Sequence, residues 1–111
     1  MIAKTPQPPY YAVIFTSIRT KGDFGYSQMA EEMEKLVAQQ PGFLGFESAR
    51  SEVGITVSYW KDLESIRNWK ENHEHTSARE NGRKIWYQNY KVRIARVEHD
   101  YGFERENLKT P

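Results

Sequence analysis

Residues 40–69 read QPGFLGFESARSEVGITVSYWKDLESIRNW, and this stretch decides the fold. Pro41-Gly42 is expected to end a preceding helix. Asp62 is a suitable N-cap for a helix that reaches Trp69. Between these two points lie two runs rich in aromatic and β-branched residues, close enough in sequence to form a hairpin: Phe43–Arg50 and Ile55–Trp60. The stretch therefore predicts a helix end, a β-hairpin and a helix start in that order.

The flanking sequence completes the pattern. Upstream, Tyr10–Ile18 (YYAVIFTSI) predicts a strand, and apolar residues at three- and four-residue spacing from Tyr26 to Val37 predict a helix. Downstream, helical residues resume over 76–82 after a break near 72–75. Trp86–Val97 predicts a last strand, with Phe103 as its furthest end. The order βαββαβ indicates a ferredoxin-like α+β fold, an antiparallel sheet with two helices on one face.

The chain length of 111 residues fits one such domain, expected over residues 10–103 with polar tails at 1–9 and 104–111. There are no cysteines, which excludes disulfides, thiolate chemistry and cysteine-based metal clusters. No stretch approaches the roughly 20 apolar residues of a membrane span, and the first residues lack a signal-like apolar run. We therefore expect a cytoplasmic protein without a membrane partner.

The predicted sheet carries large side chains on both faces. Val57 and Tyr59 alternate with Trp60, and Tyr87 alternates with Tyr90 and Val92. Two helices cover only one face, so the other face needs a second cover. Packing of two sheets around a two-fold axis supplies it, which predicts a homodimer through sheet faces. The alternative is that tyrosine and tryptophan lie on a half-hydrated surface.

Three runs of sequence resemble the antibiotic biosynthesis monooxygenase family of dimeric α/β-barrel proteins, and in particular a largely uncharacterised bacterial branch. These runs are QPGFLGFE at 40–47, VSYWKDLESIRNW at 57–69 and EHTSARENGRKIWY at 74–87. The resemblance covers roughly residues 10–101. It implies a dimer with a pocket between helices and sheet. The family mixes quinone-forming monooxygenases, heme degraders, isomerase- or aldolase-like members and proteins of unknown role.

The resemblance and the residue chemistry together give four candidate site residues. Trp69 corresponds to a tryptophan that borders the pocket in the relatives, where it would stack on a flat substrate; the alternative is an ordinary core anchor. His75 follows six residues later, and a histidine can transfer a proton near neutral pH. Its alternative is a helix-end histidine bonded to a backbone carbonyl. Tyr59 and Arg83 are weaker substrate-binding candidates, Arg83 as a clamp for an anion or phenolate.

Metal, heme, nucleotide and nucleic-acid binding are all disfavoured. His73 and His75 diverge on a helix, and a third ligand would have to come from His99. The heme-degrading relatives place their iron ligand where this chain has Arg79, and an asparagine where it has Phe15. No glycine-rich phosphate loop precedes a helix. The basic residues near the C-terminus are offset by acidic ones, and the formal net charge is only +1.

These observations favour a cofactor-independent monooxygenase acting on a small aromatic or phenolic compound, with His75 as the catalytic residue and no bound cofactor. Two alternatives remain open: a non-catalytic small-molecule-binding or stress-related dimer, and an isomerase- or lyase-type enzyme on a small metabolite.

Overall fold

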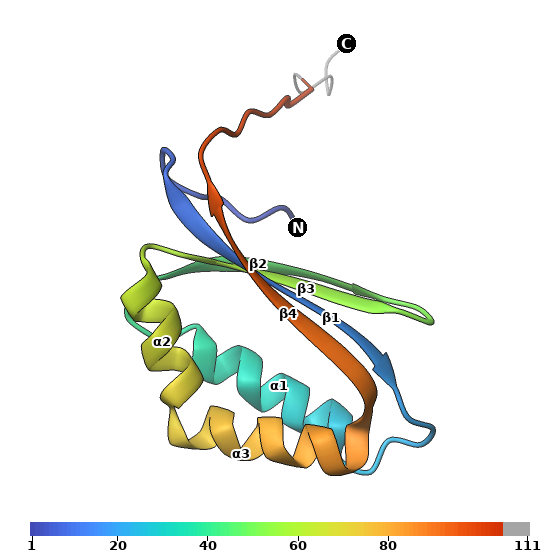
Figure 1. Cartoon of the computed structure of the whole chain (residues 1–111). Coiled ribbons are helices and arrows are strands. Elements are labelled where there is room, and N and C mark those ends of the chain that lie inside the picture. The colour runs from blue at the N-terminus through green and yellow to red at the C-terminus, as the bar shows by residue number, and fades with distance from the viewer. Residues whose placement is uncertain (106–111) are drawn as a thin grey trace.

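The computed structural model of the chain describes residues 1–105 (Figure 1). Its four strands form one antiparallel sheet in the order β2-β3-β1-β4. The elements follow the chain as β1 (Tyr10–Arg19), α1 (Tyr26–Val37), β2 (Phe43–Arg50), β3 (Gly54–Trp60), α2 (Leu63–Glu71), α3 (His73–Asn81), the π-helical turn η1 (Gly82–Trp86) and β4 (Tyr87–Val97). The ferredoxin-like α+β fold predicted from the sequence is confirmed.

The second predicted helix is divided into two, α2 and α3, so three helices flank the sheet instead of two. The division lies at Asn72, whose ψ of 130° is not helical. The Asn72 side chain caps α3, because its Oδ1 accepts hydrogen bonds from the backbone N–H groups of Glu74 (3.0 Å) and His75 (3.2 Å). His75 therefore lies in the capped first turn of α3, and the predicted restart at residue 76 is three residues late.

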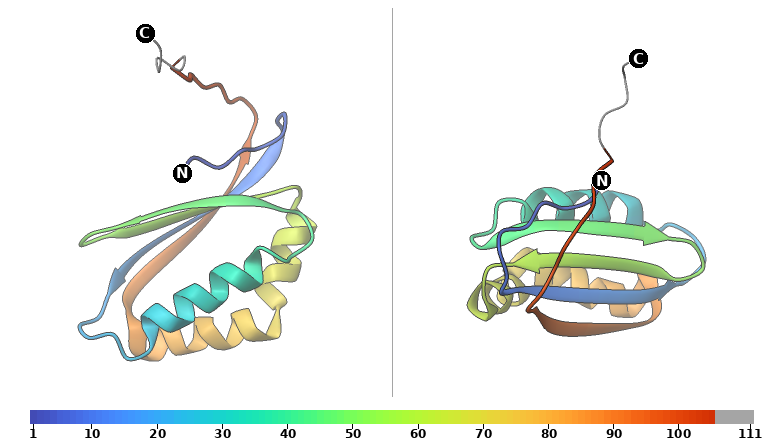
Figure 2. Two further views of the ribbon diagram at one scale, coloured as in Figure 1. Left: turned by 180° about the vertical axis from the view of Figure 1, so that it is seen from behind. Right: turned by 90° about the horizontal axis from the view of Figure 1, so that it is seen from above.

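The helices all lie on one side of the sheet (Figures 1 and 2). On the other side the N-terminal segment crosses the sheet, where the backbone N–H of Ala3 donates to Glu47 Oε2 at 2.9 Å. Residues 98–105 continue past β4 outside any strand and rise away from the domain on this same side (Figure 1). Within residues 1–105 the helices are too short and too polar to cross a bilayer.

The turn between α1 and β2 shows why Pro41-Gly42 ends the helix. Gly42 has a φ of +82°, a conformation that glycine adopts without strain. A Cβ at this position would overlap the Ser65 side chain of α2. The Gly42 carbonyl also accepts from the backbone N–H of Lys61 at 2.8 Å. This glycine therefore lets the start of β2 approach the start of α2 closely.

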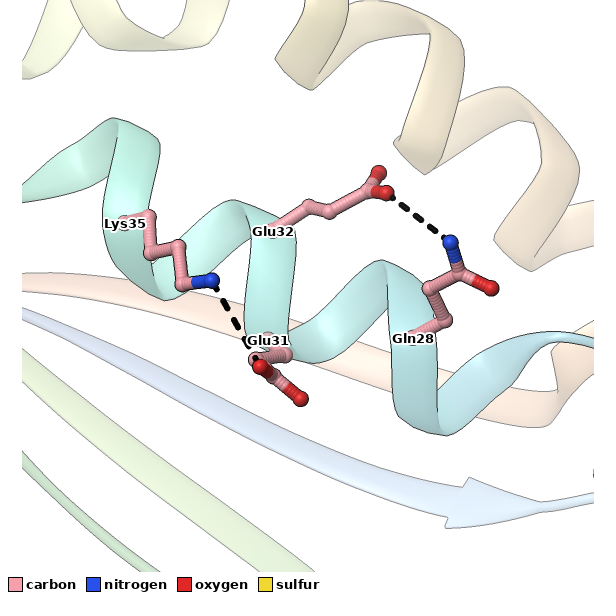
Figure 3. A network of polar contacts seen from close by, with 4 residues as sticks. All are labelled: Gln28, Glu31, Glu32 and Lys35. Atoms are coloured by element: carbon pink, nitrogen blue, oxygen red, sulfur yellow. Dashed lines mark hydrogen bonds and ion pairs between the residues drawn. The ribbon is translucent and has the colours of Figure 1, made fainter.

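Helix α1 stands apart from the rest of the helical layer in its packing. Its solvent side carries an ion pair between Lys35 and Glu31 (3.5 Å) and a hydrogen bond from Gln28 to Glu32 (3.3 Å) (Figure 3). Such exposed pairs contribute little, at most about 1 kcal/mol each. Every residue of α1 is at least partly exposed, although the helix has a well-defined apolar stripe. The stripe therefore does not pack tightly on the sheet, and the space it faces is the candidate site.

Candidate functional site

A cavity of about 550 Å³ lies between the helices and the sheet. This volume falls within the range of small-molecule sites, roughly 300–1,000 Å³. The apolar stripe of α1 forms one wall, with Tyr26, Met29, Ala30, Met33 and Val37. Aromatic and aliphatic residues of β1, β2 and β4 form the wall opposite, among them Phe15, Phe46, Tyr90 and Val92. The walls are thus largely apolar and rich in aromatic rings.

His75 and Trp69 both line this cavity, as the sequence predicts, and they form a parallel stack. Their ring centroids are 4.2 Å apart and the planes differ by 9°. His75 Nδ1 lies 2.9 Å from the carbonyl oxygen of Trp69. A carbonyl oxygen can only accept a hydrogen bond, so Nδ1 carries the proton and Nε2 keeps its lone pair. The sequence left open whether His75 bonds to a backbone carbonyl or lies in the pocket. In the structure it does both.

The environment of His75 keeps its imidazole neutral. Burial is the main cause and lowers the pKa of His75 below its ordinary value of 6.5. The hydrogen bond to the Trp69 carbonyl acts in the opposite direction, and the nearby Arg79 charge adds to the lowering of this pKa. At neutral pH the ring is therefore unprotonated at Nε2 and able to accept a proton.

Trp69 does more than border the cavity. The Trp69 indole stacks on the His75 imidazole. The centroid of this indole also lies 6.3 Å from the ring centroid of Trp60, and the planes of the two tryptophan rings differ by 29°. Trp60 itself is completely buried and is the centre of the small core. The stack therefore links the histidine to the rigid core, and Trp69 positions the imidazole.

Tyr59 does not lie in the cavity. Its hydroxyl donates to Glu47 Oε1 at 2.7 Å and its ring packs edge-on against Tyr10, on the sheet face opposite the helices. Burial and Glu47 raise its pKa to about 12. Side chains alternate along a strand, so Tyr59 faces away from the cavity when Ser58 faces into it. The expectation that Tyr59 contacts the substrate is therefore corrected: Tyr59 lies on the opposite face of the sheet and is not part of the site.

Arg79 is a site residue that the sequence analysis considered only as the counterpart of the iron ligand in the heme-degrading relatives. It lines the cavity one helical turn after His75. Its Nη1 donates to the Lys70 carbonyl at 3.2 Å, while its buried Nε has no hydrogen-bond partner among residues 1–105. The four-residue spacing from His75 was the signal that could have revealed it, because residues four apart share a helix face.

Arg83 also lines the cavity, as predicted, and its Nε donates to the hydroxyl of Tyr90 at 2.9 Å. Tyr90 belongs to a cluster of rings at this end of the cavity, in which Phe15 and Tyr87 lie 5.2 and 5.8 Å from it. Burial, followed by the Tyr26 hydroxyl, raises the pKa of Tyr87, so this tyrosine is neutral. The Tyr87 phenol is thus suited to hydrogen bonding and not to acting as a base.

The histidines do not form a metal-ligating cluster. His73 and His99 are exposed, and no group of three His, Asp or Glu side chains within residues 1–105 converges closely enough to hold a metal ion. Phe15 and Arg79, which stand where the heme-degrading relatives have other residues, both line the cavity. The donor set present is therefore one neutral imidazole among guanidinium and tyrosine side chains.

Comparison with known proteins shows the family of this chain. Residues 10–81 match the antibiotic biosynthesis monooxygenase family. The uncharacterized protein YqjZ of Bacillus subtilis is 50% identical over 105 residues, which cover 93% of this chain and 92% of that protein.

Crystal structures with the same fold have much lower identity. SnoaB, a cofactor-independent oxygenase from Streptomyces nogalater, has a TM-score of 0.67 at 11% identity over 93% of this chain and 100% of that chain. A conserved protein from Methanosarcina mazei Go1 has a TM-score of 0.72 at 9% identity over 81% of this chain and 94% of that chain. At these identities the likeness is one of fold. The match over residues 10–81 shows that the chain belongs to the antibiotic biosynthesis monooxygenase family.

Proposed function

We propose that this protein is a cofactor-independent monooxygenase that acts on a small aromatic or phenolic compound. Membership of the family and the aromatic walls of the cavity support the reaction class and the kind of substrate. The observation that carries the proposal is the fixed tautomer of His75. Its Nδ1–H is committed to the Trp69 carbonyl, and its Nε2 lone pair remains available to a ligand.

The proposed reaction needs no reductant beyond the substrate. His75 Nε2 takes the proton of a phenolic hydroxyl, and the electron-rich phenolate gives electrons to O₂ at a ring carbon. A C–O bond forms there, the O–O bond breaks, and one oxygen atom leaves as water. The balance is one phenol and one O₂ to one quinone and one water. The substrate is oxidised by four electrons and O₂ is reduced by four.

The surroundings of His75 suit this chemistry. The Arg79 guanidinium lies beside the imidazole, so its positive charge stabilises the phenolate that forms when His75 takes the proton. The largely apolar walls offer water few hydrogen-bond partners beside the oxygenated intermediate. The stack on Trp69 holds the imidazole at a fixed angle, which a base needs for proton transfer along a hydrogen bond.

Oxygen consumption tests the proposal. Purified protein is mixed with a panel of phenols and dihydroxynaphthalenes in air, with a chelator and without added cofactor. We expect enzyme-dependent O₂ uptake and formation of a quinone, seen as a new visible absorbance. Tight binding of these compounds with no O₂ uptake would support the small-molecule-binding alternative instead.

The pH dependence follows from the lowered pKa of His75. Protonated His75 cannot accept a proton, so activity should fall as the pH drops through a value below 6.5 and should be level across neutrality. Between that value and 6.5 the unfolded chain binds a proton that the folded chain does not, so the free energy of unfolding also declines as the pH falls. Rates measured from pH 5 to 8 check this. A rate that rises as the pH falls from 7 to 5 would contradict it.

We also propose that the protein is a homodimer whose subunits pack through the sheet faces opposite the helices. That face carries the half-buried Ile14 and Val57, which are cross-strand neighbours. The segment 98–105 extends from the same side and ends with two aromatic side chains in solvent, Tyr101 (100% exposed) and Phe103 (81% exposed). A second copy on this face would cover both features.

A further inference from the structure

We propose that the cavity contains a carboxylate-binding subsite, formed by Arg50 and Arg83, that selects aromatic acids. The inference deepens the proposed function, since it defines the far end of the substrate whose phenolic end His75 would deprotonate. It rests on the positions of the cationic side chains that line the cavity. Neither the family match nor the sequence analysis assigns Arg50 and Arg83 to a common binding site.

Arg50 reaches its place by crossing the sheet. It ends β2 opposite Gly54 of β3, which in turn pairs with Ser17 of β1. The guanidinium passes over Gly54, where any Cβ would overlap it, and Nη2 donates to the hydroxyl of Ser17. Ser17 is only 2% exposed, so this hydroxyl is a fixed anchor. The Arg50 Cζ atom then lies 5.9 Å from the ring centre of Tyr26.

Arg83 approaches the cavity from the other edge of the sheet. It donates to the hydroxyl of Tyr90 on β4, and Tyr90 is the cross-strand partner of Ser17. Neighbouring residues on paired strands have Cβ atoms about 5 Å apart, so the side chains that anchor the two guanidinium groups start from adjacent points of the sheet. Both arginines line the cavity, and both remain accessible to a ligand entering it.

The side chains that line the cavity carry an excess of positive charge, which favours an anionic ligand. Arg50, Lys70, Arg79 and Arg83 line it, against the single carboxylate of Glu34. Among residues 1–105 the one ion pair within 4.0 Å joins Lys35 to Glu31, outside the cavity. Neither Arg50 nor Arg83 therefore has a carboxylate partner in the described part of the chain. The forked guanidinium group matches a planar carboxylate with two parallel hydrogen bonds.

His75 and Arg83 lie at opposite ends of α3, because His75 is in its first turn and Arg83 is in the turn that follows it. A ligand that reaches both therefore carries its hydroxyl at one end and its carboxylate at the other. The cavity is lined by aromatic rings between these two ends. The substrate class is therefore a hydroxylated aromatic acid.

Isothermal titration calorimetry without oxygen tests the subsite with two probes of equal shape, 6-hydroxy-2-naphthoate and its neutral carboxamide. We expect the wild-type protein to bind the acid at least tenfold more tightly than the amide. Arg50→Gln and Arg83→Gln should each weaken the acid about tenfold, the effect of one charge-assisted hydrogen bond, and leave the amide unchanged. Gly54→Ala should act like Arg50→Gln, because its methyl group displaces the guanidinium. Lys84→Gln, an exposed neighbour of Arg83 outside the cavity lining, is the matched control.

Equal affinity for the acid and the amide would overturn the subsite, as would arginine variants that behave like Lys84→Gln. Failure to bind either probe would overturn it too. The measurement is independent of turnover, so it separates the two proposals. Selective acid binding without oxygen uptake would reject the oxygenase and keep the subsite. Oxygen uptake with no preference for the acid over the amide would reject the subsite and keep the oxygenase.

Discussion

Replacing His75 by alanine should reduce turnover of an oxidisable phenol roughly 100- to 10,000-fold, the usual contribution of a general acid–base group. The loss follows from removal of the Nε2 lone pair, which the bond from Nδ1 to the Trp69 carbonyl keeps available. The measurement is the initial rate of O₂ uptake at saturating phenol, with circular dichroism to show that the fold persists. Binding of the phenol should change much less than the rate.

Two variants separate proton transfer from positioning. His75→Gln keeps a hydrogen-bonding side chain but cannot titrate near neutrality, so it should lose the rate and the acid limb of the pH profile together. Trp69→Phe keeps an aromatic face under the imidazole at reduced area, so it should retain a substantial part of the rate. If His75→Gln kept full activity with an unchanged pH profile, His75 would be a structural residue and the catalytic assignment would fail.

Val57→Asp should abolish the dimer or give insoluble protein. Val57 lies near the middle of β3, paired with Ile14 on one side and Glu47 on the other, on the face away from the helices. A carboxylate placed there would be buried without a partner between two sheets, which costs several kcal/mol. Light scattering at micromolar concentration should give about twice the chain mass of 13.1 kDa for the wild type.

Asn68→Asp is the control for this experiment, since it adds a carboxylate of similar size on the exposed side of α2. It should remain a dimer. Val92 is not an equivalent test position, because it pairs with Phe15 and lines the cavity on the helix side. A wild-type protein that scatters as a monomer, or a Val57→Asp variant that stays dimeric, would contradict the sheet-face interface.

The fold could be predicted from the sequence because its signals are local. The Pro41-Gly42 stop, the Asp62 cap and the period-two runs each act within a few residues, and the structure has them as expected; Asp62 Oδ1 accepts from the Ser65 backbone N–H at 2.8 Å. The division between α2 and α3 was harder to place. Asn72 caps a helix that begins at His73, within a stretch that has no apolar periodicity to mark the start.

The site was only partly predictable, since it depends on contacts between distant elements. His75 and Trp69 follow from the resemblance, Arg83 follows from its side-chain chemistry, and all three line the cavity. Alternate residues of β3 face opposite sides of the sheet, and Tyr59 is on the side away from the helices. Because both faces of the strand carry large side chains, the sequence does not show which residues face the cavity. The reach of Arg50 over Gly54 to Ser17 depends on strand order, which brings β1 beside β3.

The central claim is that the chain itself, without a cofactor, catalyses the transfer of one oxygen atom from O₂ to a phenol with His75 as base. Mass spectrometry of the product formed under ¹⁸O₂, in ordinary water and with a chelator present, tests this most directly. The account predicts a quinone that carries one ¹⁸O atom, formed by the wild-type protein and nearly absent with His75→Ala. A quinone without ¹⁸O, or labelled product formed equally fast by His75→Ala, would contradict it.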